Sequence, residues 1–385
     1  MILENARVVL PDTTLEHGFV RLEDGFIAAI GEGNAPKGLE PRLDLRGHTL
    51  IPGIVDIHGD MLERELEPRP GTYFPVELAL HELDKRLAAN GVTTAYAAVA
   101  LGDGPGLRSE ERARALIRTI RAARDSLLTD MRVHARFEIG LEQSVSLVHE
   151  CLERDELDLV SLMDHTPGQG QFRDLERYVE YMRRWLGNRE AAEMSAREGV
   201  ARPASWDIGR EVAQSALKRG VQVASHDDDS PDKVALMCEF GATISEFPVT
   251  LEAARAARAA GLFVAMGAPN ALRGASHGGN LSARDALEAG ALDILAADYH
   301  PASLAAAAFA LEASGLCALH ESVALVTLNP ARAAGLTDRG RVKVGCRADL
   351  AVYSRDATPR LRLTLRDGRA TYDDGTLRSK AQVLT

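Results

Sequence analysis

Histidine and carboxylate side chains recur along this chain in combinations that can hold a divalent metal ion. His58 and Asp60 are separated by one glycine, at the end of the apolar run IPGIVDIHGD. If this run is a strand, both side chains face the same way, because strand residues alternate between two faces. An imidazole and a carboxylate on one face suit Zn²⁺, Mn²⁺ or Fe²⁺ better than Ca²⁺ or a soft metal. The triplet His58-Gly59-Asp60 is therefore predicted to open a metal site.

Further candidate ligands stand at the ends of other apolar runs. They are Glu138, His165, His226 and Asp298. A carboxylate such as Glu138, reaching in from another strand, can bridge two ions. Water bound to such an ion has a pKa of roughly 7, so it loses a proton near neutral pH. Asp298 is placed to orient that hydroxide and take its proton, which makes it the expected catalytic residue as well as a ligand.

Each of these groups has a simpler explanation when taken alone. A single histidine at a strand end is more often a hydrogen-bonded core or surface residue than a ligand, and Glu138 could pair with Arg136 or Arg132. Several histidines and carboxylates together are harder to explain, because buried charges must be paired or metal-bound. Within the run Asp227–Asp229, one carboxylate is expected to face the site, and Asp228 is taken as the candidate substrate contact.

Two further stretches offer groups that bind an anionic substrate. The Gly-rich stretch MGAPNALRGASHGGNLSA, residues 266–283, has backbone N–H groups that can cradle phosphate oxygens. The stretch after residue 60 supplies arginines, whose forked guanidinium suits phosphate or phosphonate. The alternatives are a flexible surface loop and ordinary ion pairs with neighbouring glutamates. The candidate substrate-binding residues are Arg64, Arg69, Arg136, Asp228, Asn270, Arg273, His277, Asn280 and His300.

The elements that must position these groups alternate regularly in the middle of the chain. Near-continuous apolar strands alternating with amphipathic helices indicate a parallel sheet. Eight such units favour a (β/α)8 barrel of the TIM type over an open sheet. Barrel enzymes place their active sites at the C-terminal ends of the strands, so groups from residue 58 to residue 300 would meet at one mouth. The expected strands are 51–60, 91–99, 132–140, 158–165, 221–229, 242–248, 262–269 and 293–301.

The two ends of the chain have a different character from the middle. Both are rich in short β-like runs separated by Asp-Gly turns. We expect residues 1–50 and 336–385 to form one small β-sandwich domain, beside a barrel of residues 51–335. Residues 166–220 are expected to be a charged helical insertion in the barrel, which could cover the site as a lid.

The overall composition argues against several other classes of protein. The chain has 385 residues and a net charge of −11, so a broad nucleic-acid-binding surface is not expected. No apolar run approaches the ~20 residues of a membrane span, and the N-terminus does not read as a signal peptide. The four cysteines lie far apart, which favours buried free thiols in a reducing compartment. We expect a cytoplasmic protein without a nucleic-acid or membrane partner, which could form a homo-oligomer.

These motifs resemble the amidohydrolase superfamily along nearly the whole chain. The resemblance lies in the start IPGIVDIHGD, the aspartate of the eighth strand and the stretch RVKVGCRADLAVY. The usual first-strand motif of that superfamily is His-X-His. The departure His58-Gly59-Asp60, with LERELEPRPG, LMDHTPGQGQF, ASHDDDS, GAPNALRGASHGGNLSA and AADYHP, is similar to its diphosphatase branch in the carbon–phosphorus lyase pathway of phosphonate catabolism.

This resemblance implies a reaction and a cofactor. The reaction would be hydrolysis of a small phosphorylated ribosyl phosphonate, α-D-ribose 1-methylphosphonate 5-triphosphate or a relative, to the 5-phosphate and pyrophosphate by a metal-bound hydroxide. The cofactor would be one or two divalent ions of the zinc type. No lysine stands near the end of strand four, where the superfamily often has a carbamylated lysine, so Glu138 is the implied bridge. The alternatives are cleavage of a C–N bond, by a cyclic amidase or a sugar-phosphate deacetylase, and a barrel scaffold without catalysis. The implied ligands are His58, Asp60, Glu138, His165, His226 and Asp298.

Overall fold

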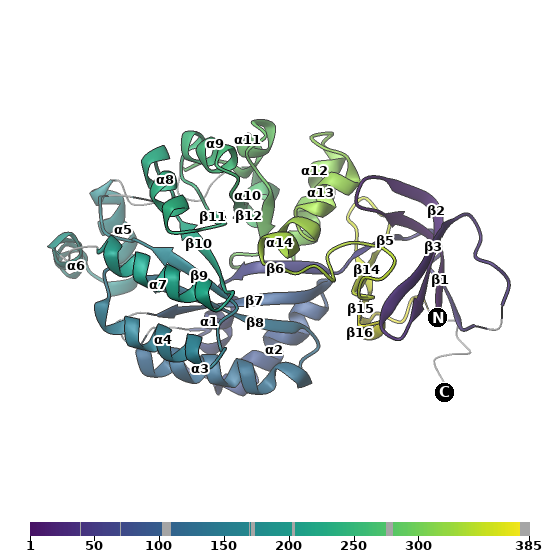
Figure 1. The fold of residues 1–385 in the computed structure, drawn as a ribbon, viewed down its shortest axis with the longest axis horizontal. Helices are drawn as coiled ribbons and strands as arrows, with labels where there is room; N and C mark the ends of the chain where they lie inside the picture. The colour runs from purple at the N-terminus through teal and green to yellow at the C-terminus, as the bar shows by residue number, and fades with distance from the viewer. Residues whose placement is uncertain are drawn as a thin grey trace.

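The computed structural model contains a barrel and a separate mixed sheet, which lie at opposite ends of an elongated molecule (Figure 1). It describes residues 1–38, 40–69, 71–101, 109–168, 170, 174–201, 205–274 and 280–377.

The barrel has eight parallel strands that follow one another in sequence order, which confirms the expected (β/α)8 architecture. The last strand returns to the first through Asp298, which pairs with Gly59 in an isolated parallel bridge. The strands are buried along almost their whole length because helices cover their outer face. They are β6 (Ile54–Gly59), β7 (Val92–Leu101), β8 (Asp130–Glu138), β9 (Leu159–Met163), β10 (Gln222–His226), β11 (Ile244–Glu246), β12 (Phe263–Gly267) and β13 (Ile294–Ala296).

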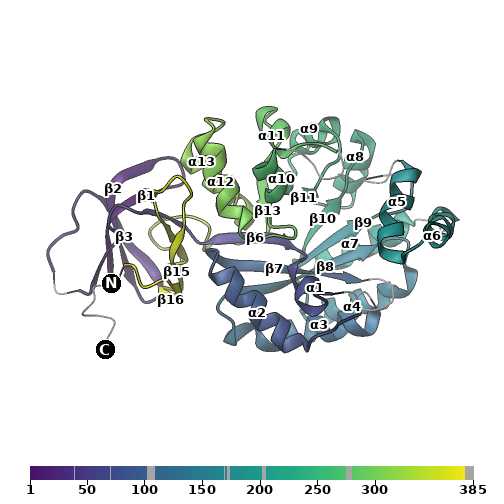
Figure 2. The same ribbon diagram turned by 180° about the vertical axis from the view of Figure 1, so that it is seen from behind.

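Helices, most of them amphipathic, form the outer layer of the barrel (Figure 2). In the helix from Glu110 to Ala123, the buried residues Ala113, Leu116, Ile117 and Ile120 are spaced so that they fall on one face. The outer helices are α1 (Met61–Leu66), α2 (Val76–Ala88), α3 (Glu110–Ala123), α4 (Val145–Glu153), α7 (Trp206–Lys218), α8 (Pro231–Glu239), α9 (Leu251–Ala259), α10 (Ala268–Arg273), α11 (Ala283–Glu288), α12 (Ser303–Ala313) and α13 (Leu319–Ala324). The helix α14 (Leu328–Ala333) instead packs Ala331 and Ala333 against apolar residues inside the barrel, such as Leu159 and Ala224.

The helical insertion between β9 and β10 is a two-helix hairpin. It consists of α5 (Leu175–Leu186) and α6 (Arg189–Ala201), which turn at Gly187 in a left-handed conformation. Val179, Ala192 and Ala196 form its small buried core. In Figures 1 and 2 the hairpin lies at the end of the barrel remote from the mixed sheet. The insertion is shorter than residues 166–220, because α7 packs against β9 and β10 as a barrel helix.

The second sheet is assembled from both ends of the chain. Its strand order is β16-β15-β14-β5-β1-β2-β3, and β4 also pairs with β1. The antiparallel pair β5–β14 joins the two parts, and Leu3, Val20, Leu50 and Val352 belong to the core beneath them. The strands are β1 (Ile2–Val9), β2 (Thr14–Glu23), β3 (Phe26–Glu32), β4 (Arg42–Asp44), β5 (Thr49–Pro52), β14 (Leu350–Tyr353), β15 (Leu361–Arg366) and β16 (Arg369–Asp373).

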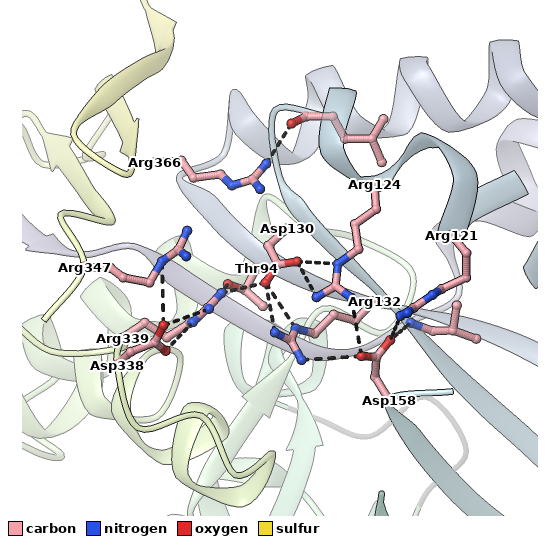
Figure 3. Close-up of polar contacts among 12 residues, drawn as sticks. Thr94, Arg121, Arg124, Asp130, Arg132, Asp158, Asp338, Arg339, Arg347 and Arg366 are labelled. Atoms are coloured by element: carbon pink, nitrogen blue, oxygen red, sulfur yellow. Dashed lines mark hydrogen bonds and ion pairs between the residues drawn. The ribbon is translucent and has the colours of Figure 1, made fainter. Parts of the chain in front are cut away.

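The second sheet and the segment before it contact the N-terminal end of the barrel. Arg339, which precedes β14, donates to Thr94 Oγ1 of β7 at 2.9 Å and to Asp130 Oδ2 of β8 at 2.7 Å (Figure 3). Arg366 of β15 donates to the carbonyl of Leu127 at 2.7 Å. These contacts leave the C-terminal ends of the barrel strands available for a site.

No helix among the described residues has the length and apolar character needed to cross a membrane. All four cysteines are free, with Cys151 and Cys346 buried and Cys238 and Cys317 half-buried.

Candidate metal centre at the barrel mouth

The C-terminal ends of the barrel strands bring histidines and carboxylates together. His58 lies in β6 and His226 ends β10, and both are almost completely buried. Glu246 ends β11 with no exposed surface. Asp298 follows β13, and its backbone joins β6: its N–H donates to the carbonyl of His58 at 3.0 Å and its carbonyl accepts from Asp60 at 2.7 Å. The predicted ligands His58, His226 and Asp298, which span 240 positions of the sequence, thus meet at one mouth.

Three histidines at this mouth each direct Nδ1 toward a carboxylate. His58 Nδ1 lies 3.1 Å from Glu246 Oε1, and His226 Nδ1 lies 3.3 Å from Glu246 Oε2. His165 Nδ1 lies 2.8 Å from Glu138 Oε2. A carboxylate on one ring nitrogen fixes the tautomer and the orientation of an imidazole whose other nitrogen binds a metal.

The opposite nitrogen of each ring faces a second carboxylate at a longer distance. His165 Nε2 lies 3.6 Å and His226 Nε2 lies 3.8 Å from the same oxygen, Asp227 Oδ2. His58 Nε2 lies 3.7 Å from Asp60 Oδ1. These distances exceed a good hydrogen bond. They are close to the roughly 3.3 Å that separates two ligands of one tetrahedral zinc ion, given metal–ligand bonds of about 2.0–2.1 Å.

The chemistry of these side chains fits a divalent cation. His165, His226 and Asp227 each offer one donor atom to a group whose atoms lie within 4.8 Å of one another. Asp227 Oδ2 is buried and has no hydrogen-bond partner among the residues that the structure describes. A buried oxygen without a partner is costly, and a bound cation would remove that cost.

A second group, made of His58, His226 and Glu246, also satisfies the spacing of metal donors. Here each ring contacts a different oxygen of Glu246, at the two short distances given above. Glu246 Oε2 additionally accepts from the hydroxyl of Ser161 at 2.7 Å. This pattern is carboxylate–imidazole pairing beneath the mouth rather than three donors converging on one point.

The pKa shifts at the mouth reflect this mixture of burial and charge. Burial by itself would lower the pKa of His165, but Asp227 and Glu138 raise it to about 9. Burial and the charge of Asp60 raise the pKa of Asp298 to about 6, although His58 opposes the shift. Burial would raise the pKa of Glu246, but His58 and His134 hold it well below its usual value. The carboxylates around His165 thus stabilise its protonated ring, and the same negative charge favours a bound cation. Burial and the charge of Arg136 lower the pKa of His226 instead, which keeps that ring neutral and able to act as a ligand.

Three residues at or just after strand ends adopt the left-handed backbone conformation. Asp227, Phe247 and Asp298 have φ angles of 53°, 54° and 54°. Such angles are uncommon for residues other than glycine and cluster at functional sites. At Asp227 and Asp298, the residue with this backbone conformation is itself one whose carboxylate lies at the mouth. The ring of Phe247 packs edge-on against His58 and His226, at centroid distances of 4.8 and 5.4 Å.

The run of three aspartates separates into three different roles. Asp227 faces the two histidines, as described above. Asp228 accepts from the hydroxyls of Ser225 and Ser245 and lies 3.8 Å from Lys233 Nζ. Since Ser225 and Ser245 adjoin His226 and Glu246, which point inward, Asp228 lies on the outer side of the barrel wall. The proposed substrate contact at Asp228 is therefore wrong in position, and Asp227 takes the place at the mouth. Asp229 Oδ2 accepts from the N–H of Gly170 at 3.3 Å.

The two other predicted carboxylate ligands are each engaged by a neighbour. Both oxygens of Glu138 bind His165, one through its backbone N–H at 2.9 Å and the other through its ring. Its position therefore suits orientation of that histidine more than bridging of two ions. Asp60 accepts from Arg136 Nη1 with both oxygens, at 2.9 and 3.0 Å. Arg136 was expected to contact substrate, and here its guanidinium lies among the ligands themselves.

Glu246 and His134 are the site residues that sequence reasoning missed. His134 is fully buried, lies on the same face of β8 as Arg136, and contacts the Ser161 hydroxyl at 2.5 Å. Burial lowers its pKa to about 3. Glu246 stands at the end of the expected strand 242–248, so the rule that found Glu138 would also have found it. His134 lies inside a strand, where no end position marks it.

The predicted substrate-binding residues lie in several environments. Arg64 of α1 stacks over the ring of Tyr299 at 5.0 Å, and its charge acts to lower the pKa of Asp298. Asn270 binds the backbone at Leu281 and Ala283 with both ends of its amide, so it closes the Gly-rich loop rather than pointing freely into the mouth. The others described are Arg69, Arg273 and His300, which are exposed, and Asn280, which is half-buried; His277 lies outside the described residues.

The chain is similar in sequence to known hydrolases. A family model described as "Amidohydrolase family" matches residues 208–372. An α-D-ribose 1-methylphosphonate 5-triphosphate diphosphatase from Escherichia coli (strain K12) is 37% identical over 366 residues, which cover 92% of this chain and 95% of that protein. An imidazolonepropionase from Deinococcus deserti is 26% identical over 365 residues, which cover 89% of this chain and 87% of that protein.

Solved structures with the same architecture have lower sequence identity. A 5-methylcytosine deaminase from Klebsiella pneumoniae, liganded with 5-fluorocytosine, matches with a TM-score of 0.67 and 16% identity, and the match covers 100% of both chains. A variant N-acetyl-D-glucosamine-6-phosphate deacetylase from Mycobacterium smegmatis matches with a TM-score of 0.65 and 16% identity, covering 96% of this chain and 99% of that chain. At this level of identity, the likeness concerns the fold alone.

Proposed function

Because this chain belongs to the amidohydrolase superfamily, we propose that it is a metal-dependent hydrolase of a phosphoric anhydride. Its substrate would be α-D-ribose 1-methylphosphonate 5-triphosphate or a closely related ribosyl phosphonate, and its products the 5-phosphate and pyrophosphate. The observation that carries this proposal is the 37% identity with the E. coli diphosphatase across almost the whole of both chains. The donors at the barrel mouth support the metal dependence.

The ion would be held by the histidine nitrogens and carboxylates that face the mouth. His165, His226 and Asp227 form the most compact group, and His58, Asp60 and Asp298 lie around it. Imidazole and carboxylate ligands suit zinc, manganese or iron. When bound, such an ion lowers the pKa of water and stabilises negative charge on phosphate oxygens.

Asp298 is the proposed general base of this reaction. Burial raises the pKa of its carboxyl to about 6, so the group is mostly ionised at neutral pH yet basic enough to accept a proton. In the proposed step, the water oxygen forms a bond to the α-phosphorus and Asp298 takes the proton. The bond from that phosphorus to the bridging oxygen breaks, and pyrophosphate leaves with the electron pair.

Arg64 is the arginine best placed to contact the substrate near this base. Its guanidinium lies over the Tyr299 ring, and its charge acts on Asp298. A guanidinium held by an aromatic face keeps its donors directed outward for phosphate oxygens. The guanidinium of Arg64 would bind an anionic substrate more tightly than a neutral one. Its position therefore favours a triphosphate over a neutral cyclic amide as the substrate.

The direct test is incubation of the metal-loaded protein with the ribosyl phosphonate 5-triphosphate, followed by ³¹P NMR. We expect the triphosphate resonances to be replaced by those of pyrophosphate and a 5-phosphate. Asp298→Asn should lose at least about a hundredfold in rate, since a general base contributes roughly 10²–10⁴-fold. Turnover of cyclic amides or N-acetyl sugar phosphates without pyrophosphate release would contradict the proposal.

A further inference from the structure

Arg136 is a buried arginine that lies at the barrel mouth, beside side chains that could bind a metal ion. Arg136 comes from β8 and faces the barrel interior with only 12% of its side chain exposed. Nη1 donates to both oxygens of Asp60, and Nε donates to the sulfur of Met163 at 3.2 Å. Nη2 lies 3.4 Å from His226 Nε2. Each nitrogen of the guanidinium therefore contacts a group of the mouth or its wall.

Two of these contacts involve side chains that were expected to bind metal. Asp60 presents its whole carboxylate to the guanidinium, and its Oδ1 also lies 3.7 Å from His58 Nε2. An ion bound between Asp60 and His58 would lie beside a charge that cannot be removed, because a guanidinium stays protonated throughout the ordinary pH range. Arg136 and a cation at Asp60 thus compete for one carboxylate.

The donor group of His165, His226 and Asp227 is not bound by Arg136 in the same way as Asp60 is. Asp227 Oδ2 and His165 Nε2 have no contact with the guanidinium among the interactions described for these residues, and they converge with His226 Nε2. The 3.4 Å from Arg136 to His226 is long for a hydrogen bond. One compact donor group therefore remains for an ion, next to a fixed positive charge.

We propose that the positively charged guanidinium of Arg136 takes the place of a second metal ion at this centre. The chain would then bind one divalent ion per molecule. The ion would lie at His165, His226 and Asp227, while Arg136 neutralises Asp60. For an anionic substrate, a guanidinium can stabilise charge on phosphate oxygens as a metal does, although it cannot activate water. The inference rests on the metal dependence proposed above but not on the identity of the substrate.

The test is the metal stoichiometry of the purified protein after equilibrium dialysis against Zn²⁺ or Mn²⁺. Wild type is expected to bind one ion per chain, and the Mn²⁺ form should give the electron paramagnetic resonance spectrum of an isolated ion. Asp60→Asn should still bind one ion, whereas Asp227→Asn should lose it. Arg136→Gln, which frees Asp60, should gain a second ion.

Arg132→Gln is the matched control, because Arg132 lies on the same face of β8 at the opposite end of the barrel. It should keep a single ion. Two ions in wild type, loss of the ion in Asp60→Asn, or unchanged stoichiometry in Arg136→Gln would overturn the inference. A wild-type protein that binds no ion would contradict the proposed metal dependence as well, whereas two ions would leave that proposal intact.

Discussion

At the residue scale, Glu246 is the group on which the geometry of the mouth depends most. Its two oxygens contact the Nδ1 atoms of His58 and His226, and the Ser161 hydroxyl fixes one of these oxygens. Both Nε2 atoms consequently face the mouth. Loss of such an orienting carboxylate lowers metal affinity by roughly 10- to 100-fold in other metal sites.

We therefore expect Glu246→Gln to weaken metal binding by about 10- to 100-fold. The amide keeps one acceptor oxygen but presents an N–H₂ group to the other histidine, which can then no longer donate from Nδ1. Competition with a chromophoric chelator measures the affinity. Glu252→Gln, an exposed change on α9, serves as the control. Equal affinity of Glu246→Gln and wild type would show that Glu246 does not orient the ligands.

The sequence predicted most of the residues at the mouth, but it did not predict which of them contact each other or face the site. Strand ends identified His58, His226 and Asp298, because polar residues after buried strands must share one end of a barrel. Which aspartate of the run 227–229 faces the mouth depends on a positive φ at Asp227, and no residue pattern encodes that angle. The pairing of Asp60 with Arg136 joins residues 76 positions apart, so it also depends on the assembled barrel.

At the element scale, two turns between a helix and a barrel strand have the same backbone conformation but different neighbours. Gly91 and Gly290 each follow a helix and have a left-handed φ, of 78° and 67°. Gly91 directly precedes β7, and three residues separate Gly290 from the start of β13. A Cβ at Gly290 would meet no atom of the described residues within 4 Å, whereas one at Gly91 would lie 2.4 Å from the hydroxyl of Tyr353 in β14. That hydroxyl donates to the carbonyl of Asn90 at 2.8 Å.

Gly91→Ala should therefore cost more stability than Gly290→Ala. Both variants place a side chain in the left-handed region, at a cost of about 1–2 kcal/mol. Gly91→Ala adds overpacking against Tyr353, which costs about 1–3 kcal/mol more. Urea unfolding measures the difference, and Tyr353→Phe in the Gly91→Ala background should recover part of it. Equal destabilisation by the two glycine substitutions would contradict a close approach of the second sheet at this turn.

The sequence predicted the elements well because each strand and helix has a local pattern. All eight expected barrel strands are present, with ends that differ by a few residues. The insertion was predicted too long, because α7 has the same amphipathic character as α5 and α6 but packs against β9 and β10. Helical periodicity states which face is apolar and does not state what that face contacts.

At the scale of the whole molecule, a network of charged side chains connects the barrel to the segment that leads into the second sheet (Figure 3). Asp130 is its centre and has only 6% exposure. Its Oδ1 accepts from Arg124 at 2.9 Å, and its Oδ2 accepts from Arg132 at 3.1 Å and from Arg339 at 2.7 Å. Arg339 is 209 positions away in the chain, which is why sequence reasoning assigned this network no role.

The charge of Asp130 predicts how stability depends on pH. Burial alone would raise the pKa of Asp130, but Arg132, Arg124 and Arg339 hold it below its usual value. In the unfolded chain an aspartate has a pKa of about 3.9. The network therefore stabilises the fold fully above that pKa, and this contribution is lost as the pH falls, because the unfolded state takes up the proton first.

Asp130→Asn should accordingly be less stable than wild type by about 3 kcal/mol at neutral pH, since it removes the buried carboxylate that Arg124, Arg132 and Arg339 share. The difference between the two proteins should shrink as the pH falls below about 4. Urea unfolding at a series of pH values checks both points.

Asp338→Asn is the control variant, because it removes a more exposed partner of Arg339, with 45% of its side chain accessible. Its cost in stability should stay near 1 kcal/mol or below, as for surface pairs. A pH-independent difference between wild type and Asp130→Asn would mean that the carboxylate charge does not hold this junction together.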